Sequence, residues 1–173
     1  SYVAMRKDDK AGLVTFNEYF DTFVPASKQV GQMQTLLENL YKQETTFGET
    51  DFSALCGHLG KHVNKRSFLV LYTNFSNMTS LNRQLVYLQQ LARQHRVLVV
   101  FFEDADLKEY IAGKSVTTED YYRHVIAEKF AFEKRLIVST LKQHGIYSLL
   151  TTPDKLSIDV INKYLEMKSR QLL

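Results

Sequence analysis

Short apolar runs alternate along the chain with segments in which apolar residues recur every three or four positions. A short apolar run suits a buried strand, and the three-to-four spacing suits a helix with one buried face. Alternation of the two is typical of an α/β fold, in which a parallel sheet is covered by helices on both faces. The pattern predicts five strands, over 11–17, 19–25, 65–73, 95–104 and 145–153.

The first two strand segments predict a hairpin. Segment 19–25 alternates in polarity and ends in Pro25, which suits a short antiparallel strand at a sheet edge. Segments 65–73 and 95–104 are instead continuously apolar, so we expect strands buried on both faces. With the helical segment between them they form a strand, helix, strand unit of the size of a right-handed parallel crossover.

Four longer helices are predicted from periodicity and caps. Ser27 caps the first, whose apolar stripe we expect in the core, and Thr50 and Asp51 are alternative caps of the second. A long helix over 117–144 stops at Gly145. The last helix, within 154–173, has one predicted apolar side, formed by Ile158, Ile161, Leu165 and Lys168.

Composition limits the classes of protein. The chain has 173 residues, 45% of them hydrophobic, which suits one compact domain over 1–173. Its apolar runs are far shorter than the roughly 20 residues of a membrane helix, so we expect no membrane contact by this segment. The 22 lysine and arginine residues are scattered and interleaved with 19 acidic residues, and the net charge is only +3. Nucleic-acid binding needs a denser basic patch, so we expect none. The single cysteine, Cys56, excludes an internal disulfide framework.

The candidate site lies at the carboxyl ends of the predicted parallel strands, where ligands gather in open α/β sheets. Glu103 and Asp104 are adjacent and point in different directions, which makes a poor catalytic pair. A solvated strand end is the alternative interpretation. The polar groups at the three strand ends are Thr73, Asn74, Glu103, Asp104, Thr151 and Thr152.

His58 and His62 lie one helical turn apart, which is compatible with two imidazoles on one metal. No glutamate follows the first histidine and no third ligand is evident, so the pattern favours an ordinary surface helix. The glycines form no phosphate-binding cluster, and no nucleophile elbow is present. We therefore expect that the chain is not an enzyme.

Five stretches, in order, are similar to an uncharacterised bacterial family. They are DDKAGLVTFN, GETDFSALCGHL, RSFLVLYTNFSN, LARQHRVLVVFFEDADL and YLEMKSRQLL. The chain resembles domain-of-unknown-function family fifty-eight, a von Willebrand factor A-like domain often encoded beside MoxR-type AAA+ ATPases. The resemblance implies a doubly wound sheet whose first strand and start of first helix are missing, so we expect a C-terminal piece of a longer domain.

The resemblance also implies a metal-ion-dependent adhesion site at the strand ends. Its threonine maps onto Thr50, and its second aspartate maps onto Asn74. The Asp, Ser, Ser stretch of the first strand is absent, and an amide brings no negative charge to Mg²⁺. We expect a degenerate site that holds no cofactor in this segment, with Mg²⁺ bound only in the full-length protein. Gly48, Thr73 and Asp104 form the expected partner-binding rim.

The favoured hypothesis is a non-enzymatic interaction module that acts with a MoxR-type AAA+ ATPase in assembly or maturation of a complex. The alternative is a Rossmann-like nucleotide-binding or hydrolytic enzyme that uses the same strand ends. Loss of the central strand would expose the edges of the strands of Leu13 and Leu71, so we expect a rearranged sheet or a homodimer. We expect a cytoplasmic location, with a membrane anchor in the full-length protein.

Overall fold

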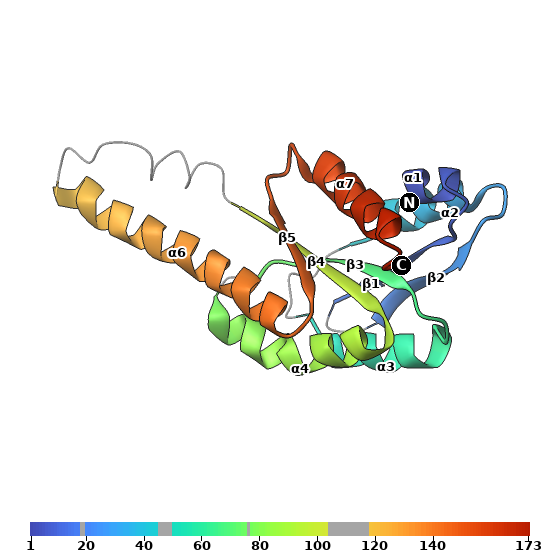
Figure 1. Cartoon of the computed structure of the whole chain (residues 1–173), viewed down its shortest axis with the longest axis horizontal. Coiled ribbons are helices and arrows are strands. Elements are labelled where there is room, and N and C mark those ends of the chain that lie inside the picture. The colour runs from blue at the N-terminus through green and yellow to red at the C-terminus, as the bar shows by residue number, and fades with distance from the viewer. Residues whose placement is uncertain (18–19, 45–49, 76, 104–117) are drawn as a thin grey trace. The chain divides into compact units, whose positions relative to one another are not determined.

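The computed structural model divides the chain into two compact units, Ser1–Asn64 and Lys65–Leu173 (Figure 1). It has mixed α/β structure, as predicted, with one two-stranded antiparallel sheet and one three-stranded parallel sheet. The predicted single doubly wound sheet is therefore not formed by the described strands, and the single domain over 1–173 stays a prediction. The residues that the structure describes are 1–17, 20–44, 50–75, 77–103 and 118–173.

The first unit is built around the predicted hairpin. Strand β1 pairs antiparallel with β2, and the register shifts between Ala11 and Leu13. Gly12 lies at this irregularity, where an added Cβ would come within 2.7 Å of the Val24 carbonyl oxygen. Only glycine allows this close approach of the two backbones. The elements of the unit are α1 (Tyr2–Arg6), β1 (Ala11–Phe16), β2 (Phe20–Ser27), α2 (Gln32–Tyr41) and α3 (Phe52–His62).

The prediction that Ser27 caps the next helix is wrong. Helix α2 begins after Gly31, which has a φ of 91° and takes the N-cap position. Ser27 instead ends β2, and its hydroxyl accepts a hydrogen bond from the Gln29 backbone N–H. The expected apolar stripe is also mostly exposed, since Leu36 is buried while Leu40 is 48% exposed. The apolar stripe therefore predicted correctly that this segment is a helix, but the prediction that the stripe is buried in the core is wrong.

A glutamine, rather than the stripe, ties α2 to the hairpin. The buried Gln32 amide donates hydrogen bonds to the carbonyl oxygens of Ala11, at 2.8 Å, and Pro25, at 2.9 Å. These bonds satisfy two strand carbonyls that the ladder leaves open. Asp51, one of the two residues predicted to cap the next helix, is the N-cap of α3. Its carboxylate accepts hydrogen bonds from the backbone N–H groups of Ser53 and Ala54.

The second unit contains the predicted parallel strands in the order β3, β4, β5. Side chains alternate between the two faces of a strand, and every residue of β4 from Val97 to Phe101 is at most 2% exposed. Both faces of β4 are therefore covered, with α4 and α6 on one side and α7 on the other (Figure 1). The elements are β3 (Phe68–Tyr72), α4 (Met78–Gln94), β4 (Arg96–Phe102), α6 (Thr118–Gln143), β5 (Tyr147–Thr151) and α7 (Leu156–Ser169).

Strand β3 differs from its prediction because it lies at an edge. Of its side chains only Leu71 is buried, and Tyr72 is 54% exposed, so the strand is not buried on both faces. Among the described strands β1 pairs only with β2, and β3 only with β4. Pairing of the Leu13 and Leu71 strands, which belong to different units, with each other or with a second chain stays a prediction.

The two C-terminal helices form where the sequence predicts them. Helix α6 ends before Gly145, whose φ of 71° suits the predicted stop, although the predicted start at Thr117 lies outside the described residues. The buried side of α7 was predicted incorrectly. Ile158 is 62% exposed, and the helix buries Tyr164 and Met167 instead.

Candidate functional site

The carboxyl end of β3 carries the most specific polar arrangement in the second unit. The Thr73 N–H donates to the Val100 carbonyl oxygen at 3.1 Å, which extends the parallel ladder by one residue. Asn74 is the first residue beyond the ladder and is exposed. Its side-chain oxygen Oδ1 accepts a hydrogen bond of 2.7 Å from Nζ of Lys134, on α6. The Phe75 carbonyl oxygen accepts a second bond from the same ammonium, at 2.8 Å.

An aromatic ring also lies beside the Lys134 ammonium. Its Nζ lies 5.6 Å from the ring centroid of Phe101, a residue of β4 with no exposed surface. Phe75 is also buried, at 3% exposure. Burial lowers the pKa of Lys134 from its ordinary value, because the charged form loses hydration there. Within the described part of the chain, this ammonium forms no ion pair with a carboxylate.

The two residues predicted to hold a metal belong to different compact units. Thr50 is half-buried in the first unit, directly before Asp51, while Asn74 belongs to the second unit. The Asn74 oxygen already accepts from an ammonium, so a divalent cation at the same oxygen would meet a like charge about 4 Å away. The Asn74 environment therefore does not fit Mg²⁺, and the pairing with Thr50 stays a prediction.

No cluster of three histidine, cysteine, aspartate or glutamate side chains that could hold a metal occurs among the described residues. Of the predicted partner-binding rim, Thr73 is half-buried beside Asn74. Gly48 and Asp104 lie outside the described residues.

The ends of β4 and β5 are held by hydrogen bonds within the fold. The Glu103 N–H donates to the Thr151 carbonyl oxygen at 2.9 Å. The buried Thr151 hydroxyl donates at 2.5 Å to Oδ2 of Asp159, in the first turn of α7. A hydroxyl that the sequence offered as a site candidate therefore anchors a helix.

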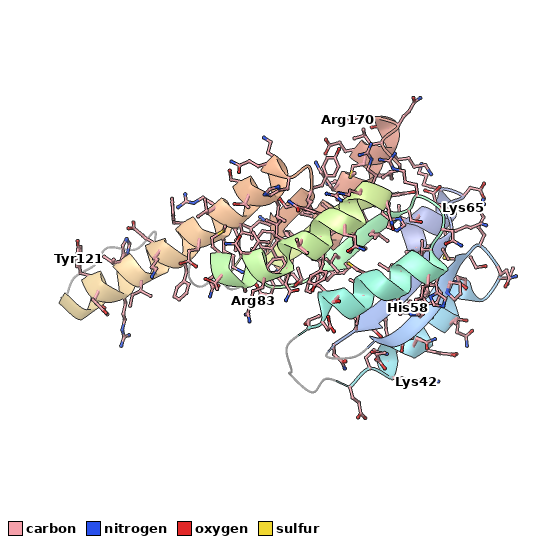
Figure 2. All side chains as sticks on the ribbon, turned by 90° about the horizontal axis from the view of Figure 1, so that it is seen from below. Lys42, His58, Lys65, Arg83, Tyr121 and Arg170 are labelled. Atoms are coloured by element: carbon pink, nitrogen blue, oxygen red, sulfur yellow. The ribbon has the colours of Figure 1, made fainter. Side chains whose placement is uncertain are left out.

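His58 and His62 face each other on α3, where their rings stack with centroids 4.0 Å apart and an interplanar angle of 13° (Figure 2 labels His58). Phe23 of the hairpin packs edge-on against His58 at 5.0 Å. Desolvation lowers the pKa of His58, with smaller contributions from His62 and Lys61. Stacked parallel rings do not aim their nitrogen lone pairs at a common point, so this geometry favours the surface-helix interpretation over a metal chelate.

Cys56 is 5% exposed on the same helix. Burial, together with the nearby Asp51 carboxylate, raises the pKa of its thiol to about 11. The thiolate is the nucleophilic form, so this cysteine is a buried apolar side chain rather than a nucleophile. A surface hollow of about 390 Å³ lies beside the amino ends of β4 and β5, lined by Gln89, Ala92, Arg93, His144 and Gly145.

Sequence reasoning identified the location of the strand-end site and missed its cation. Lys134 is separated from Asn74 by 60 residues and stands in a helix with many charged positions. Only the three-dimensional packing of α6 brings it to β3. Its one sequence cue is its position three residues before Ile137, on the buried side of the helix.

Comparison with known proteins gives one match. The model of the family described as "Protein of unknown function DUF58" matches residues 1–118, about two thirds of the chain. The match covers the first unit and continues through β4 of the second, whereas β5 and α7 lie beyond it. No curated protein and no solved structure matches. None of the described helices is long and apolar enough to cross a membrane.

Proposed function

Because the chain belongs to the DUF58 family, we propose that it is a non-enzymatic protein-interaction module that works with a MoxR-type AAA+ ATPase. In this role it would contribute to assembly or maturation of a larger complex. The single observation that carries the proposal is an apolar face on α6. We define this α6 face by four exposed residues, Tyr121, Val125, Phe132 and Leu136.

The α6 face is a continuous stripe along the helix. Its residues are spaced by four, seven and four positions, which places them on one side at the helical period. They are 63%, 46%, 60% and 41% exposed, respectively. The buried residues Ala127, Ile137 and Leu141 mark a different side, which faces the rest of the unit. The helix therefore has apolar side chains both on a buried side and on the exposed α6 face, and Tyr122, Ile126 and Phe130 are exposed as well.

An open stripe of this kind suits a partner. Single exposed apolar residues are ordinary on protein surfaces, but aligned aromatic and aliphatic side chains are typical of interaction sites. The N-terminal half of α6, where Tyr121 lies, extends away from the three-stranded sheet and is accessible to a second protein (Figures 1 and 2). The stripe is thus placed to enter a groove of a partner.

The wider fold proposal is a von Willebrand factor A-like domain with a degenerate metal site. It is supported by the parallel strands β3, β4 and β5, by the helices on both of their faces, and by polar groups at their carboxyl ends. In that fold the polar strand ends form a contact surface. The neutral Asn74 in place of an aspartate supports contact by the protein's own groups rather than through a metal.

The test is binding of the full chain to a purified MoxR-type ATPase from the same genome, measured by biolayer interferometry. Substituting Tyr121→Ser together with Phe132→Ser should weaken binding at least tenfold, because two aromatic anchors of the α6 face are lost. Ile158→Ser on α7 removes another exposed apolar side chain and is the matched control, with unchanged binding. Equal binding by both variants, or no binding by the parent chain, would refute the proposal.

A calorimetric titration with Mg-ATP separates this function from the enzyme alternative. The interaction module should give no heat of nucleotide binding without its partner. Saturable ATP binding by the chain alone would support a Rossmann-like nucleotide-binding protein instead.

A further inference from the structure

The end of β3 holds a cation that belongs to the protein itself. The Lys134 ammonium is bound by Oδ1 of Asn74 and by the Phe75 carbonyl oxygen, at 2.7 and 2.8 Å. Both acceptors are neutral oxygens. The ammonium is therefore positioned by two directional bonds, but its positive charge is not neutralised by them.

The hydrogen-bonding capacity of this ammonium is not exhausted. An ammonium group carries three N–H donors. Two of them serve Asn74 and Phe75. A partly buried cation without an anionic partner is costly, and an anion brought to it is correspondingly stabilised. The described residues provide neither an anionic partner nor an acceptor for the third donor, which is therefore left to bond to such an anion.

The surroundings strengthen the field at this point. The buried ring of Phe101 replaces polarisable water on one side of the ammonium, and lowers the local dielectric constant. Helix α4 begins at Met78, three residues after Phe75, so the positive end of its dipole lies at the same end of β3. The structure thus combines a fixed ammonium, a helix N-terminus and an apolar wall.

We propose that this Lys134 cluster, formed by Asn74, Phe75, Phe101 and Lys134, is a binding site for a carboxylate side chain from an acidic segment of a partner protein. One ammonium matches the single charge of a carboxylate, whereas a phosphate monoester carries nearly two charges, which this one cation leaves partly uncompensated. The lysine ammonium would bind the carboxylate directly, as a metal ion at a strand end would, so no metal is needed.

This inference rests on the proposed function only in that a partner protein supplies the carboxylate. It names a second contact, separate from the α6 face, because Lys134 is bonded to the end of β3 while the residues of that face are open to solvent. A peptide can therefore test it without the ATPase. Failure of the peptide experiment would leave the α6 face unaffected, and failure of ATPase binding would leave the Lys134 cluster unaffected.

The experiment uses the full chain and a fluorescently labelled peptide of alternating Glu and Gly residues, with binding followed by anisotropy at low ionic strength. Lys134→Met should weaken binding at least tenfold, since it keeps the side-chain stem and removes the charge. Lys134→Arg should stay within about threefold of the parent, because a cation is retained. Lys129→Met removes the same charge from an exposed position on α6 and should change binding less than twofold.

Two further peptides identify the chemistry. A peptide with Gln in place of every Glu should not bind, and a phosphoserine peptide of the same net charge should bind no more tightly than the Glu peptide. Equal losses in the Lys134→Met and Lys129→Met variants would overturn the proposal, because they would indicate general charge attraction. Tighter binding of the phosphoserine peptide would overturn the assignment to a carboxylate. Far-ultraviolet circular dichroism checks that each variant is folded.

Discussion

Nζ of Lys134 lies 2.7 Å from Oδ1 of Asn74, so a helix residue places its charge beside the first residue beyond the β3 ladder. This contact joins α6 to the carboxyl edge of the parallel sheet. It also supplies a cation at the position where the resemblance to von Willebrand factor A-like domains places a metal ligand. The strand end is therefore organised by the chain's own groups.

Replacing Asn74 with aspartate should stabilise the protein. The substitution converts a hydrogen bond from the Lys134 ammonium into an ion pair of the same geometry. Because Asn74 is exposed, we expect a gain of only about 0.5 kcal/mol in the free energy of unfolding by urea. The control Asn82→Asp adds the same charge at an exposed position of α4. Equal gains from Asn74→Asp and Asn82→Asp would show that the new carboxylate forms no ion pair with Lys134, and would contradict the account.

Gly12 should not tolerate a side chain. An added Cβ would come within 2.7 Å of the Val24 carbonyl oxygen and 2.9 Å of the Ala26 nitrogen, so the hairpin backbone must shift. Gly12→Ala should lower the free energy of unfolding by about 1–3 kcal/mol, as overpacking does. Gly60→Ala in α3 is the matched control, since its Cβ meets nothing within 4 Å, and should stabilise by about 0.5–1 kcal/mol. Equal effects of the two substitutions would contradict the hairpin register.

Asp51 should contribute to stability as the cap of α3. Its carboxylate accepts from Ser53 N at 2.7 Å and Ala54 N at 3.1 Å. Asp51→Ala should cost about 1 kcal/mol in urea unfolding, whereas Asp51→Asn keeps an acceptor and should cost a few tenths, roughly. Ser27→Ala should show no loss of a helix cap, because Gly31 holds that position for α2. A loss from Ser27→Ala equal to that from Asp51→Ala would contradict these caps.

Stability should fall as the solution is acidified through the range in which His95 titrates. His95 is 2% exposed, and burial lowers its pKa below the ordinary value of 6.5. The unfolded chain then binds the proton more readily than the folded one. The neutral imidazole's stabilising contribution is fully present above pH 6.5 and is lost as the pH falls toward the lower folded pKa.

His95→Gln should reduce this pH dependence. Its amide oxygen can still accept from Ser67 N, which bonds to Nδ1 of His95 at 3.3 Å. The measurement is the free energy of unfolding by urea between pH 7 and about 5, where the slope follows the difference in bound protons. His124→Gln on α6 is the control, and His58 is a second contributor with a lowered pKa. An unchanged slope in His95→Gln would show that His95 titrates alike in both states.

The sequence predicted elements better than it predicted exposure. The strand over 95–104 and the long helix before Gly145 formed as expected, because a continuous apolar run and a glycine with positive φ act locally. The exposed side of α7 was missed because Ile158 and Tyr164 are both apolar, and only the packed unit decides which is buried. Hydrophobic periodicity identifies a helix without identifying its neighbour.

The candidate site shows the same limit. Asn74 could be placed at a strand end from the sequence, because polar residues there follow a buried run directly. Its partner Lys134 could not, since a contact between residues 60 positions apart depends on how α6 packs. The continuous apolar sequence of β3 likewise predicts a central strand, whereas the strand lies at the edge of the three-stranded sheet and its Tyr72 is exposed. Local pattern carries no information about which strand has a neighbour.

The central claim is that the Lys134 ammonium, rather than a metal ion, is the cation at Asn74. The most direct measurement is a Mn²⁺ titration of the isotope-labelled full chain, followed by paramagnetic broadening of its NMR signals. The account predicts that the side-chain amide of Asn74 and the backbone amide of Thr73 broaden no more than those of other exposed residues. Selective broadening of both signals at substoichiometric Mn²⁺, abolished by Asn74→Ala, would contradict it.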